Sequence, residues 1–241
     1  MSQINLFCFH YAGGSATVFS SWRKHIHPQI KLIPVETAGR GMRMNESLYA
    51  DIDEATEDVF ALVLKYINNN EPYAFFGHSM GSLLCYKLVQ KLARLNLELP
   101  QHIFFSGRGA PHIERPDKVK YHLLNAKEFE QEVLKLGGTP PEFFEHKELM
   151  NLFLPILKND FKIIETSVIN KEIVPLEVDI SVFIGEDDDL TPEQRDGWKL
   201  HTNRLCTEYY FKGGHFFLHQ QTEKIVKIIN DILIEENCYN L

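Results

Sequence analysis

The chain has 241 residues, a size that suits one large α/β domain or two small ones. Hydrophobic residues make up 44% and charged residues 24%, which excludes disorder as the main state and allows a sizeable core. With 25 Lys and Arg against 33 Asp and Glu, the net charge of −8 excludes the basic footprint of a protein that binds nucleic acid or anionic membranes, so we expect small molecules or proteins as partners.

The first part of the chain alternates short apolar runs with longer amphipathic segments. The runs are rich in Ile, Phe and Val and bounded by Gly or Pro, which predicts strands at residues 4–9, 31–35, 73–76 and 102–106. Between them, apolar residues recur at steps of three and four, as on one helix face, over residues 51–67 and 82–95. This alternation predicts a mostly parallel sheet with helices on both faces.

The alternation stops over residues 107–177, where such folds usually have a connection of only about 2–6 residues. The helices expected in this stretch lie at residues 125–136, from 140 onward and at 149–163. The last of them contains Pro155, which should kink or divide it. We expect this stretch to be a helical insertion, or lid, on top of the sheet, because its apolar faces need something to cover.

The strand and helix alternation then resumes to the end of the chain. Strands are predicted at residues 181–184 and 207–211, and helices at 192–200 and 223–234. No internal repeat, low-complexity tract or linker is present in the sequence. The expected organisation is therefore one α/β domain over residues 1–241, with residues 107–177 inserted in it.

Targeting and redox signals point to the cytoplasm. The N-terminus lacks a basic region before its first apolar run, and no segment approaches the roughly 18 apolar residues of a membrane span. The four cysteines have no C-x-x-C spacing, and we expect free thiols in a reducing compartment. A cytoplasmic protein that does not contact a membrane is the expectation.

Residues 77–81 have the pattern G-x-S-x-G, with Ser79 at the centre. They lie between a predicted strand and a predicted helix, the setting in which a strained turn exposes a nucleophilic serine. Gly77 and Gly81 would allow the close approach of the two elements. A tight turn without any chemistry is the alternative explanation of the same residues.

A serine hydroxyl needs a base to take its proton, and in hydrolases of this class the order along the chain is Ser, acid, His. Of the eleven histidines, only His215 directly follows a late predicted strand, in a loop with two glycines. The acid should follow the preceding strand, where the candidates are Asp187, Asp188 and Asp189. Two of these three are expected to be solvated turn residues.

Other histidines and glycines are expected to have no role in binding a metal or cofactor. His78 adjoins the serine, but its place inside the turn should point it away from the hydroxyl, so we interpret it as structural. His25 and His27 have no third ligand at a suitable spacing, and a solvated pair is expected. No dinucleotide or phosphate-binding glycine pattern is complete, so no cofactor is predicted. No metal is predicted either, because the histidine pair has no third ligand.

The negatively charged intermediate of acyl transfer needs two backbone N–H donors. Met80 directly follows the serine and would supply one. The other should come from the turn after the first strand, at residues 10–14, where two glycines permit close backbone approach. We assign this second donor to Ala12.

A series of motifs in a fixed order points to one enzyme family. They lie at residues 8–14, 39–43, 77–81, 106–112, 136–140, 154–160 and 213–216. From about Leu6 to the final helix, the chain resembles the type II (external) thioesterases that accompany nonribosomal peptide and polyketide synthetases. It departs from the family pattern at His10 and Ala38, where prolines are common, and at residues 158–160, where an arginine is more usual.

The resemblance implies an α/β-hydrolase fold with a mobile lid, and catalysis by Ser79, Asp188 and His215. It selects Asp188 because that residue precedes Trp198 by ten positions, with Asp187 as the second choice. It also implies hydrolysis of acyl or aminoacyl thioesters from the phosphopantetheine arm of carrier proteins, which removes misprimed or stalled groups from the synthetases.

Carrier proteins are commonly acidic, so long-range attraction cannot drive their docking on a chain of charge −8. We expect docking to rest on apolar contacts and on local basic residues such as Arg40, Arg43, Arg108 and Lys118. A monomer is expected.

Two other functions agree with the same residues. One is a general small-molecule esterase or lipase of the same fold, which a comparison of carrier thioesters with simple oxygen esters would separate. The other is a catalytically silent binding protein on a hydrolase scaffold, which covalent labelling of Ser79 by a fluorophosphonate would exclude.

Overall fold

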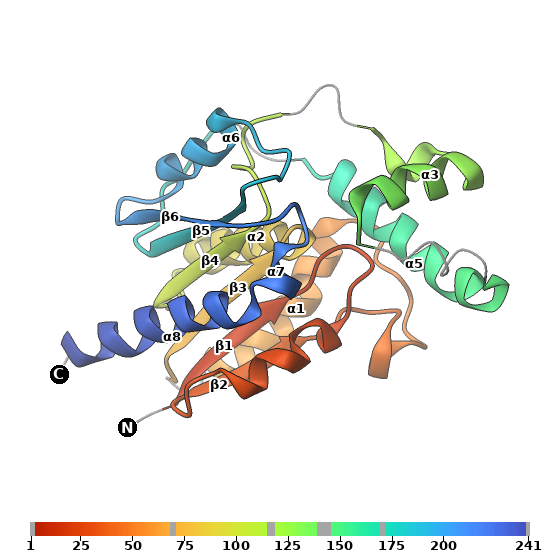
Figure 1. Ribbon diagram of the computed structural model, residues 1–241. Coiled ribbons are helices and arrows are strands. Elements are labelled where there is room, and N and C mark those ends of the chain that lie inside the picture. The colour runs from red at the N-terminus through yellow and green to blue at the C-terminus, as the bar shows by residue number, and fades with distance from the viewer. Residues whose placement is uncertain (1–2, 68–70, 115–118, 139–145, 169–171, 240–241) are drawn as a thin grey trace.

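The computed structural model describes residues 3–67, 71–114, 119–138, 146–168 and 172–239 (Figure 1). The strands in these ranges are β1 (Ile4–Phe9), β2 (Ile30–Val35), β3 (Tyr73–His78), β4 (His102–Ser106), β5 (Asp179–Gly185) and β6 (Cys206–Phe211). They form one sheet in the order β2-β1-β3-β4-β5-β6, and every neighbouring pair is parallel. The predicted parallel sheet is confirmed.

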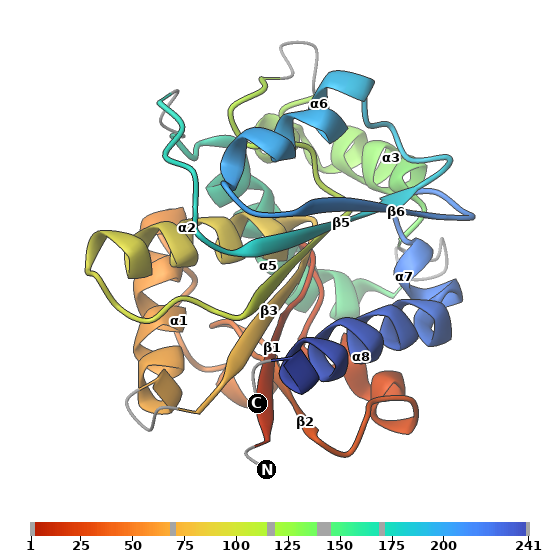
Figure 2. The same cartoon turned by 90° about the vertical axis from the view of Figure 1, so that its left-hand side faces the viewer.

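Helices cover both faces of this sheet. The α-helices described are α1 (Ile52–Ile67), α2 (Met80–Arg94), α3 (Ala126–Leu136), α5 (Lys147–Glu165), α6 (Pro192–Asp196), α7 (Phe217–Gln220) and α8 (Thr222–Tyr239). The 3-10 helices are η1 (Ala16–Lys24), η2 (Gly41–Arg43), η3 (Tyr121–Leu123) and η4 (Gly197–His201). Seen along the sheet, α1 and α2 pack on one face, and η1 and α8 on the other (Figure 2).

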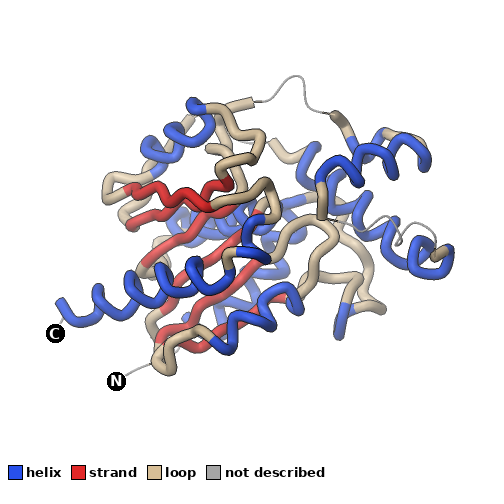
Figure 3. Tube along the Cα trace, viewed as in Figure 1, coloured by secondary structure: helices blue, strands red, loops and turns tan. Residues whose placement is uncertain are grey.

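The inner strands β1, β3, β4 and β5 are buried on both faces because their side chains alternate between two hydrophobic cores, whereas the edge strands β2 and β6 are partly exposed. Phe7 of β1 and Phe75 of β3 belong to the core under α1 and α2. Cys8 and Phe76, the next residues along the same strands, belong to the core that Trp22 of η1 shares with α8. The strands therefore lie between two helical layers, which makes the strand ends firm supports for a site (Figure 3).

Because all strands are parallel, their carboxyl ends lie at one edge of the sheet. The strand order changes direction between β1 and β3, and in such sheets ligands bind at the carboxyl ends beside this point. Residues 107–177, called here the helical segment, connect β4 to β5, and its helices α3 and α5 lie beyond this edge (Figure 1). Together with η3 they form a separate small core of Tyr121, Phe129, Val133 and Leu157.

Several predicted helices differ from the observed ones. Pro155 does not divide its helix, because α5 runs without a break from Lys147 to Glu165. A proline has no N–H, so the carbonyl one turn earlier has no helical donor. Because the proline is exposed, that carbonyl can bond to water instead. The helix expected at 192–200 is instead α6 followed by the 3-10 helix η4. The change comes at Gly197, where a Cβ would lie 2.8 Å from the side chain of Ala110. The helix expected from residue 140 lies outside the described residues.

Candidate active site

The turn between β3 and α2 holds Ser79 in a backbone conformation that few residues adopt. Its φ is 55° and its ψ is −107°, in the left-handed half of the map that favours glycine. Its N–H donates to the carbonyl of Ser106 at the end of β4, at 2.8 Å. The buried hydroxyl of Ser82 donates to the carbonyl of Gly77 at 2.7 Å, which closes the turn from the helix side. Helix α2 begins at Met80, two residues earlier than predicted, and so starts directly after the serine.

The two glycines of the G-x-S-x-G motif are required by close backbone contacts. A Cβ on Gly77 would lie 2.3 Å from the carbonyl oxygen of Gly81. A Cβ on Gly81 would lie 2.1 Å from the carbonyl oxygen of Phe9, at the end of β1. The motif thus packs the start of α2 directly against the end of β3, as the sequence indicated, and also against the end of β1, which was not predicted.

Ser79, His215 and Asp188 come together at the carboxyl edge of the sheet in one hydrogen-bonded series. His215 Nε2 lies 3.0 Å from Ser79 Oγ, and His215 Nδ1 lies 3.0 Å and 3.2 Å from the two carboxylate oxygens of Asp188. A carboxylate accepts hydrogen bonds, so Nδ1 carries the proton in a neutral imidazole and Nε2 is free to accept from the serine hydroxyl.

Of the three candidate acids at residues 187–189, Asp188 is the one that contacts His215. Its side chain is 7% exposed, whereas Asp187 and Asp189 are exposed to solvent. The N–H of Asp187 instead donates to the carbonyl of Gly213 at 3.0 Å, which joins the loop after β5 to the loop that carries His215. This backbone contact sets the distance between the acid and the histidine.

His78 is not part of the hydrogen-bonded series, and its ring packs against His215. The side chain is fully buried, and its Nδ1 lies 2.8 Å from the hydroxyl oxygen of Ser106. Burial, and after it the charge of nearby His215, holds the pKa of His78 well below its usual range. His78 therefore stays neutral, and its ring packs 5.3 Å from that of His215.

The two N–H groups assigned to the oxyanion lie on neighbouring loops. Met80 is the first residue of α2, so its N–H has no partner within the helix and lies at the positive end of the helix dipole. Ala12 lies on the loop after β1, against which the first turn of α2 packs. No hydrogen bond to the N–H of Ala12 occurs within the part of the chain that the structure describes.

The loop after β1 is held by side chains from several elements. His10 is fully buried, with Nδ1 2.9 Å from the carbonyl of Tyr11 and Nε2 3.0 Å from the hydroxyl of Thr37. Burial lowers the pKa of His10 to about 4, so the ring is neutral near pH 7. The hydroxyl of Tyr11 lies 3.0 Å from Nε2 of His219 on α7. The loop is thereby fixed to the sheet and to the segment that follows His215.

Arg40, expected on a docking surface, is in fact buried in an ion pair. It is 4% exposed, and its guanidinium makes two hydrogen bonds to the carboxylate of Asp160 on α5, at 2.7 and 2.8 Å. A buried guanidinium requires such a partner, so the expectation of a surface role was wrong.

Sequence reasoning also missed Asp160, although a signal was present. Phe153, Leu157 and Asp160 are spaced by four and three residues and share one helix face. An acidic residue on an apolar face indicates a buried partner.

The other basic residues proposed for docking have different surroundings. Arg43 donates to both Glu46 and Asp58, so its charge is balanced. Arg108 is partly buried, and burial lowers its pKa to about 10. Lys118 lies outside the described residues.

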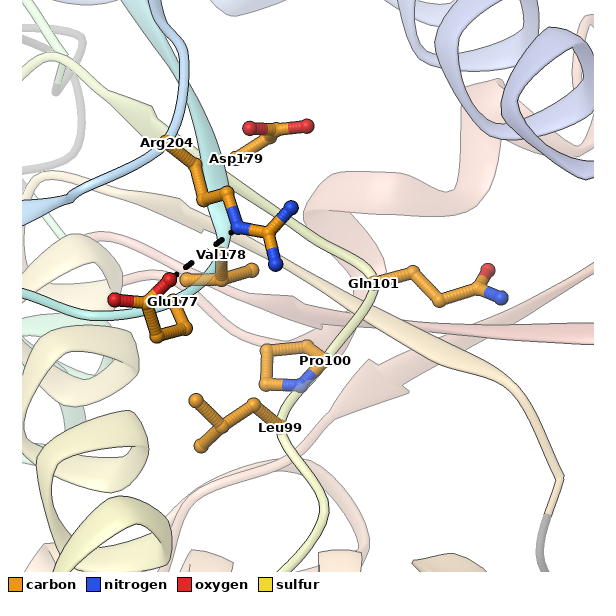
Figure 4. A pocket seen from close by; sticks show the side chains of 7 residues that line it. All are labelled: Leu99, Pro100, Gln101, Glu177, Val178, Asp179 and Arg204. Carbon is orange, nitrogen blue, oxygen red and sulfur yellow. Dashed lines mark hydrogen bonds and ion pairs between the residues drawn. The ribbon is translucent and has the colours of Figure 1, made fainter. Parts of the chain in front are cut away.

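A shallow hollow of about 220 Å³ lies at the opposite, amino edge of the sheet (Figure 4). It is lined by Leu99, Pro100, Gln101, Glu177, Val178, Asp179 and Arg204. Arg204 pairs there with Glu177 at 3.4 Å. These residues lie just before β4, β5 and β6 or, for Asp179, at the first position of β5, so the hollow is remote from Ser79. Among the described residues, no group of three or more His, Cys, Asp and Glu could hold a metal, and no helix is long and apolar enough to cross a membrane.

Comparison with known proteins identifies the family. The family model of the thioesterase domain matches residues 4–233. The chain belongs to the thioesterase family. Among solved structures, ClbQ from the colibactin NRPS/PKS pathway superposes with a TM-score of 0.92 at 33% identity, covering 99% of this chain and 100% of that one. The type II thioesterase BorB from the borrelidin biosynthetic cluster superposes with a TM-score of 0.84 at 31% identity, covering 95% and 92%.

A relative from Brevibacillus parabrevis, named linear gramicidin dehydrogenase LgrE, is 36% identical over 96% of this chain and 88% of its own. That name describes another chemistry, whereas the family model and the solved structures assign this chain to the thioesterases. The resemblance seen in the sequence is confirmed. The chain is a thioester hydrolase with an α/β-hydrolase fold, related to type II thioesterases of peptide and polyketide synthesis.

Proposed function

We propose that this thioesterase removes acyl or aminoacyl groups from the phosphopantetheine arm of carrier proteins, with Ser79 as nucleophile, His215 as base and Asp188 as the orienting acid. The observation that carries the proposal is the series Ser79–His215–Asp188, with both contacts of His215 at 3.0 Å and the serine on a strained turn. Strain of this kind, about 1–3 kcal/mol, persists where the surrounding structure holds a residue for function.

In the acylation step, Ser79 Oγ attacks the carbonyl carbon of the thioester while His215 Nε2 takes the hydroxyl proton. The carbonyl oxygen becomes negatively charged, and the N–H groups of Ala12 and Met80 donate to it. When the carbon–sulfur bond breaks, the sulfur leaves with the proton held by His215. The products are the free pantetheine thiol and an acyl ester on Ser79. Asp188 stabilises the imidazolium and keeps its Nδ1–H in place.

Deacylation uses the same groups with water in place of the thiol. His215 removes a proton from a water molecule, which attacks the ester carbonyl, and the oxyanion is again held by Ala12 and Met80. The proton returns to Ser79 Oγ as the carbon–oxygen bond breaks. The free acid leaves, and the carrier is ready for reloading. The biological role is therefore the rescue of synthetases that hold misprimed or stalled groups.

The helical segment serves as the lid under which the acyl chain enters, within a single domain that acts as a monomer. The role as a lid is supported by the two environments of the apolar side chains in the helical segment, some of which are buried and some exposed. Phe129 and Leu157 are buried in its own small core, whereas Leu123, Leu149 and Leu152 are 73%, 47% and 52% exposed. Exposed apolar side chains beside a catalytic edge suit an acyl chain or the apolar part of a carrier surface.

The proposal is tested with carrier proteins loaded with a panel of acyl groups and followed by intact-protein mass spectrometry. The expected result is loss of the acyl mass from the carrier, with kcat/KM well above that for oxygen esters of the same acids. A preference for simple oxygen esters would instead indicate a general esterase. No turnover of any ester, together with no labelling of Ser79 by a fluorophosphonate, would indicate a silent binding protein.

A further inference from the structure

The buried carboxylate of Asp160 on α5 is shared between a guanidinium and the loop after β1. It accepts two hydrogen bonds from Arg40 and a third from the N–H of Gly13, at 2.7 Å. Arg40 also donates to the carbonyl of Gly14 at 3.1 Å. Asp160 is 1% exposed, so these contacts are shielded from water. The pair therefore joins the helical segment to the loop that carries Ala12.

The same face of α5 also packs on this loop through apolar atoms. Gly13 has a φ of +75°, and a Cβ there would lie 2.7 Å from Leu157 and 2.8 Å from Phe153. Ala12 itself packs against the small core of the helical segment. Leu157, Phe153 and Asp160 thus meet the loop together.

These contacts fix consecutive peptide groups around the N–H of Ala12. That N–H belongs to the same planar group as the carbonyl of Tyr11, which accepts from the N–H of Gly14 and lies 2.9 Å from His10 Nδ1. The next peptide group contains the N–H of Gly13, which Asp160 binds. In a trans peptide group the C=O and the N–H point in opposite directions. Since the carbonyl of Tyr11 is held by its hydrogen bonds, the N–H of Ala12 is fixed in the opposite direction. Asp160 prevents the following peptide from rotating.

We propose that Asp160, with Arg40 as its charge partner, is a positioning residue that holds the N–H of Ala12 in place as an oxyanion donor. The inference rests on the proposed function, because it concerns the oxyanion of the same reaction. The hydrolytic machinery is then complete only while α5 is packed on the loop. Neither side chain is assigned a contact with substrate.

The test compares Asp160→Asn with a matched control, Asp58→Asn. Arg43 binds Asp58 through two hydrogen bonds, at 2.6 and 2.9 Å, as Arg40 binds Asp160, but this pair is partly exposed and, among the described residues, has no hydrogen bond to the loop after β1. Asp160→Asn should lower kcat by about 10²-fold, the scale of a donor displaced by about 1 Å, with KM changed little. Asp58→Asn should leave kcat within a few-fold of the wild type.

A second readout separates positioning from general damage. A trifluoromethyl ketone analogue, to which Ser79 adds to form a tetrahedral oxyanion, should lose affinity for Asp160→Asn in parallel with kcat. A non-hydrolysable thioether analogue, which forms no oxyanion, should bind as it does to the wild type. An equal loss for both analogues, or for neither, would overturn the proposal.

A double variant covers the case in which Asp160→Asn does not fold because the charge of Arg40 is left unpaired. Arg40→Met with Asp160→Leu removes both charges and refills the space, yet leaves the N–H of Gly13 without its acceptor. We expect a folded protein with low kcat. Wild-type kcat in this variant would overturn the inference while leaving the proposed function intact. Failure of the wild type to hydrolyse carrier thioesters would instead refute the proposed function itself.

Discussion

The carboxyl edge of the sheet and the helical segment are built in different ways. At the carboxyl edge of the sheet, Ser79 and Asp188 follow closely after β3 and β5, which are buried between two helical layers, and His215 follows the partly exposed edge strand β6. The helical segment has only a small core of its own, and large apolar side chains such as Leu123 and Leu152 remain exposed. The first region is supported by the two main cores. The second is supported by its own small core, by the loop after β1 and, through Ile163 of α5, by the core under α1 and α2.

This difference indicates separate roles for the two regions, with chemistry at the carboxyl edge of the sheet and substrate choice in the helical segment. Under the proposed function, the groups that must be placed within a fraction of an ångström lie where packing is continuous. The surface proposed to bind acyl chains lies where packing is sparse. Asp160 joins the second region to the loop after β1, and under our proposal it is through this contact that the helical segment positions the N–H of Ala12. Substitutions at the sheet edge should therefore abolish chemistry, and those on the exposed face of the helical segment should alter substrate choice.

The largest effect is expected for Ser79→Ala. Under the proposed mechanism, Ser79, His215 and Asp188 act as a unit, so kcat should fall by about 10⁶-fold. Alanine has the same Cβ as serine, so the strained turn and the melting temperature should change little. Activity above a few per cent, in a preparation shown to be free of wild-type enzyme, would show that the sheet edge does not carry the chemistry in this way.

Asp188→Asn should come next, with a loss of about 10⁴-fold in kcat, because an amide does not stabilise the required tautomer of His215. Asp187→Asn is the matched control, since its side chain is exposed one residue away. It should retain most of the activity. Steady-state kinetics of the two variants shows which of the two aspartates acts with His215. A severe defect in Asp187→Asn alone would contradict the observed pairing of Asp188 with His215.

Two aspartate substitutions probe the helical segment at a buried and at an exposed position. Phe129→Asp places a charge in the small core, at a cost of about 3 kcal/mol or more, so the segment should open and its amides should exchange faster than those of β3. Fluorophosphonate labelling of Ser79 should slow, because α5 no longer holds the loop after β1.

At Leu152→Asp, where the side chain is 52% exposed, labelling and stability should be retained and the preference among acyl chain lengths should shift. Loss of labelling in a folded Leu152→Asp protein, or unchanged exchange in Phe129→Asp, would contradict the division between the two regions.

The smallest effect is a pH dependence of stability at His10. Burial lowers its pKa in the folded protein to about 4, whereas an unfolded histidine titrates near 6.5. As the pH falls below about 6.5, only the unfolded chain gains the proton, so stability is lost from there down to about pH 4. His10 should account for about 2 kcal/mol of the loss between pH 7 and pH 5.

Urea unfolding at pH 7 and pH 5 measures this contribution. His10→Asn should reduce the pH dependence by that amount, and His25→Asn, at an exposed histidine, is the matched control. If His10→Asn and the wild type lose the same stability between the two pH values, the buried neutral state of His10 is wrong.

The fold and the series at the sheet edge were predictable because their signals are local. Each strand is a short apolar run, and Ser79, Asp188 and His215 each lie a few residues beyond one, in glycine-containing segments. Helix η1 was missed since its buried Phe19 and Trp22 recur at a spacing of three within a polar stretch, which differs from the α-helical period.

The Arg40–Asp160 pair was not predictable in the same way. The two residues are 120 positions apart, and the sequence around Arg40, with its flanking glycines, is typical of a surface loop. Only the packing of α5 on the loop after β1 buries both charges together. The residues alone left Asp187, Asp188 and Asp189 open as candidates. The family spacing to Trp198 favoured Asp188, and the contact of Asp188 with His215 agrees with that choice.

The proposed role of Ser79 in thioester hydrolysis is tested by fluorophosphonate inactivation with peptide mapping. We expect a single adduct, on Ser79, and loss of activity toward acyl-loaded carrier proteins in one-to-one proportion to labelling. The carrier substrate should also slow the labelling. Full activity in enzyme whose Ser79 is completely labelled, or inactivation by an adduct at another residue, would contradict it.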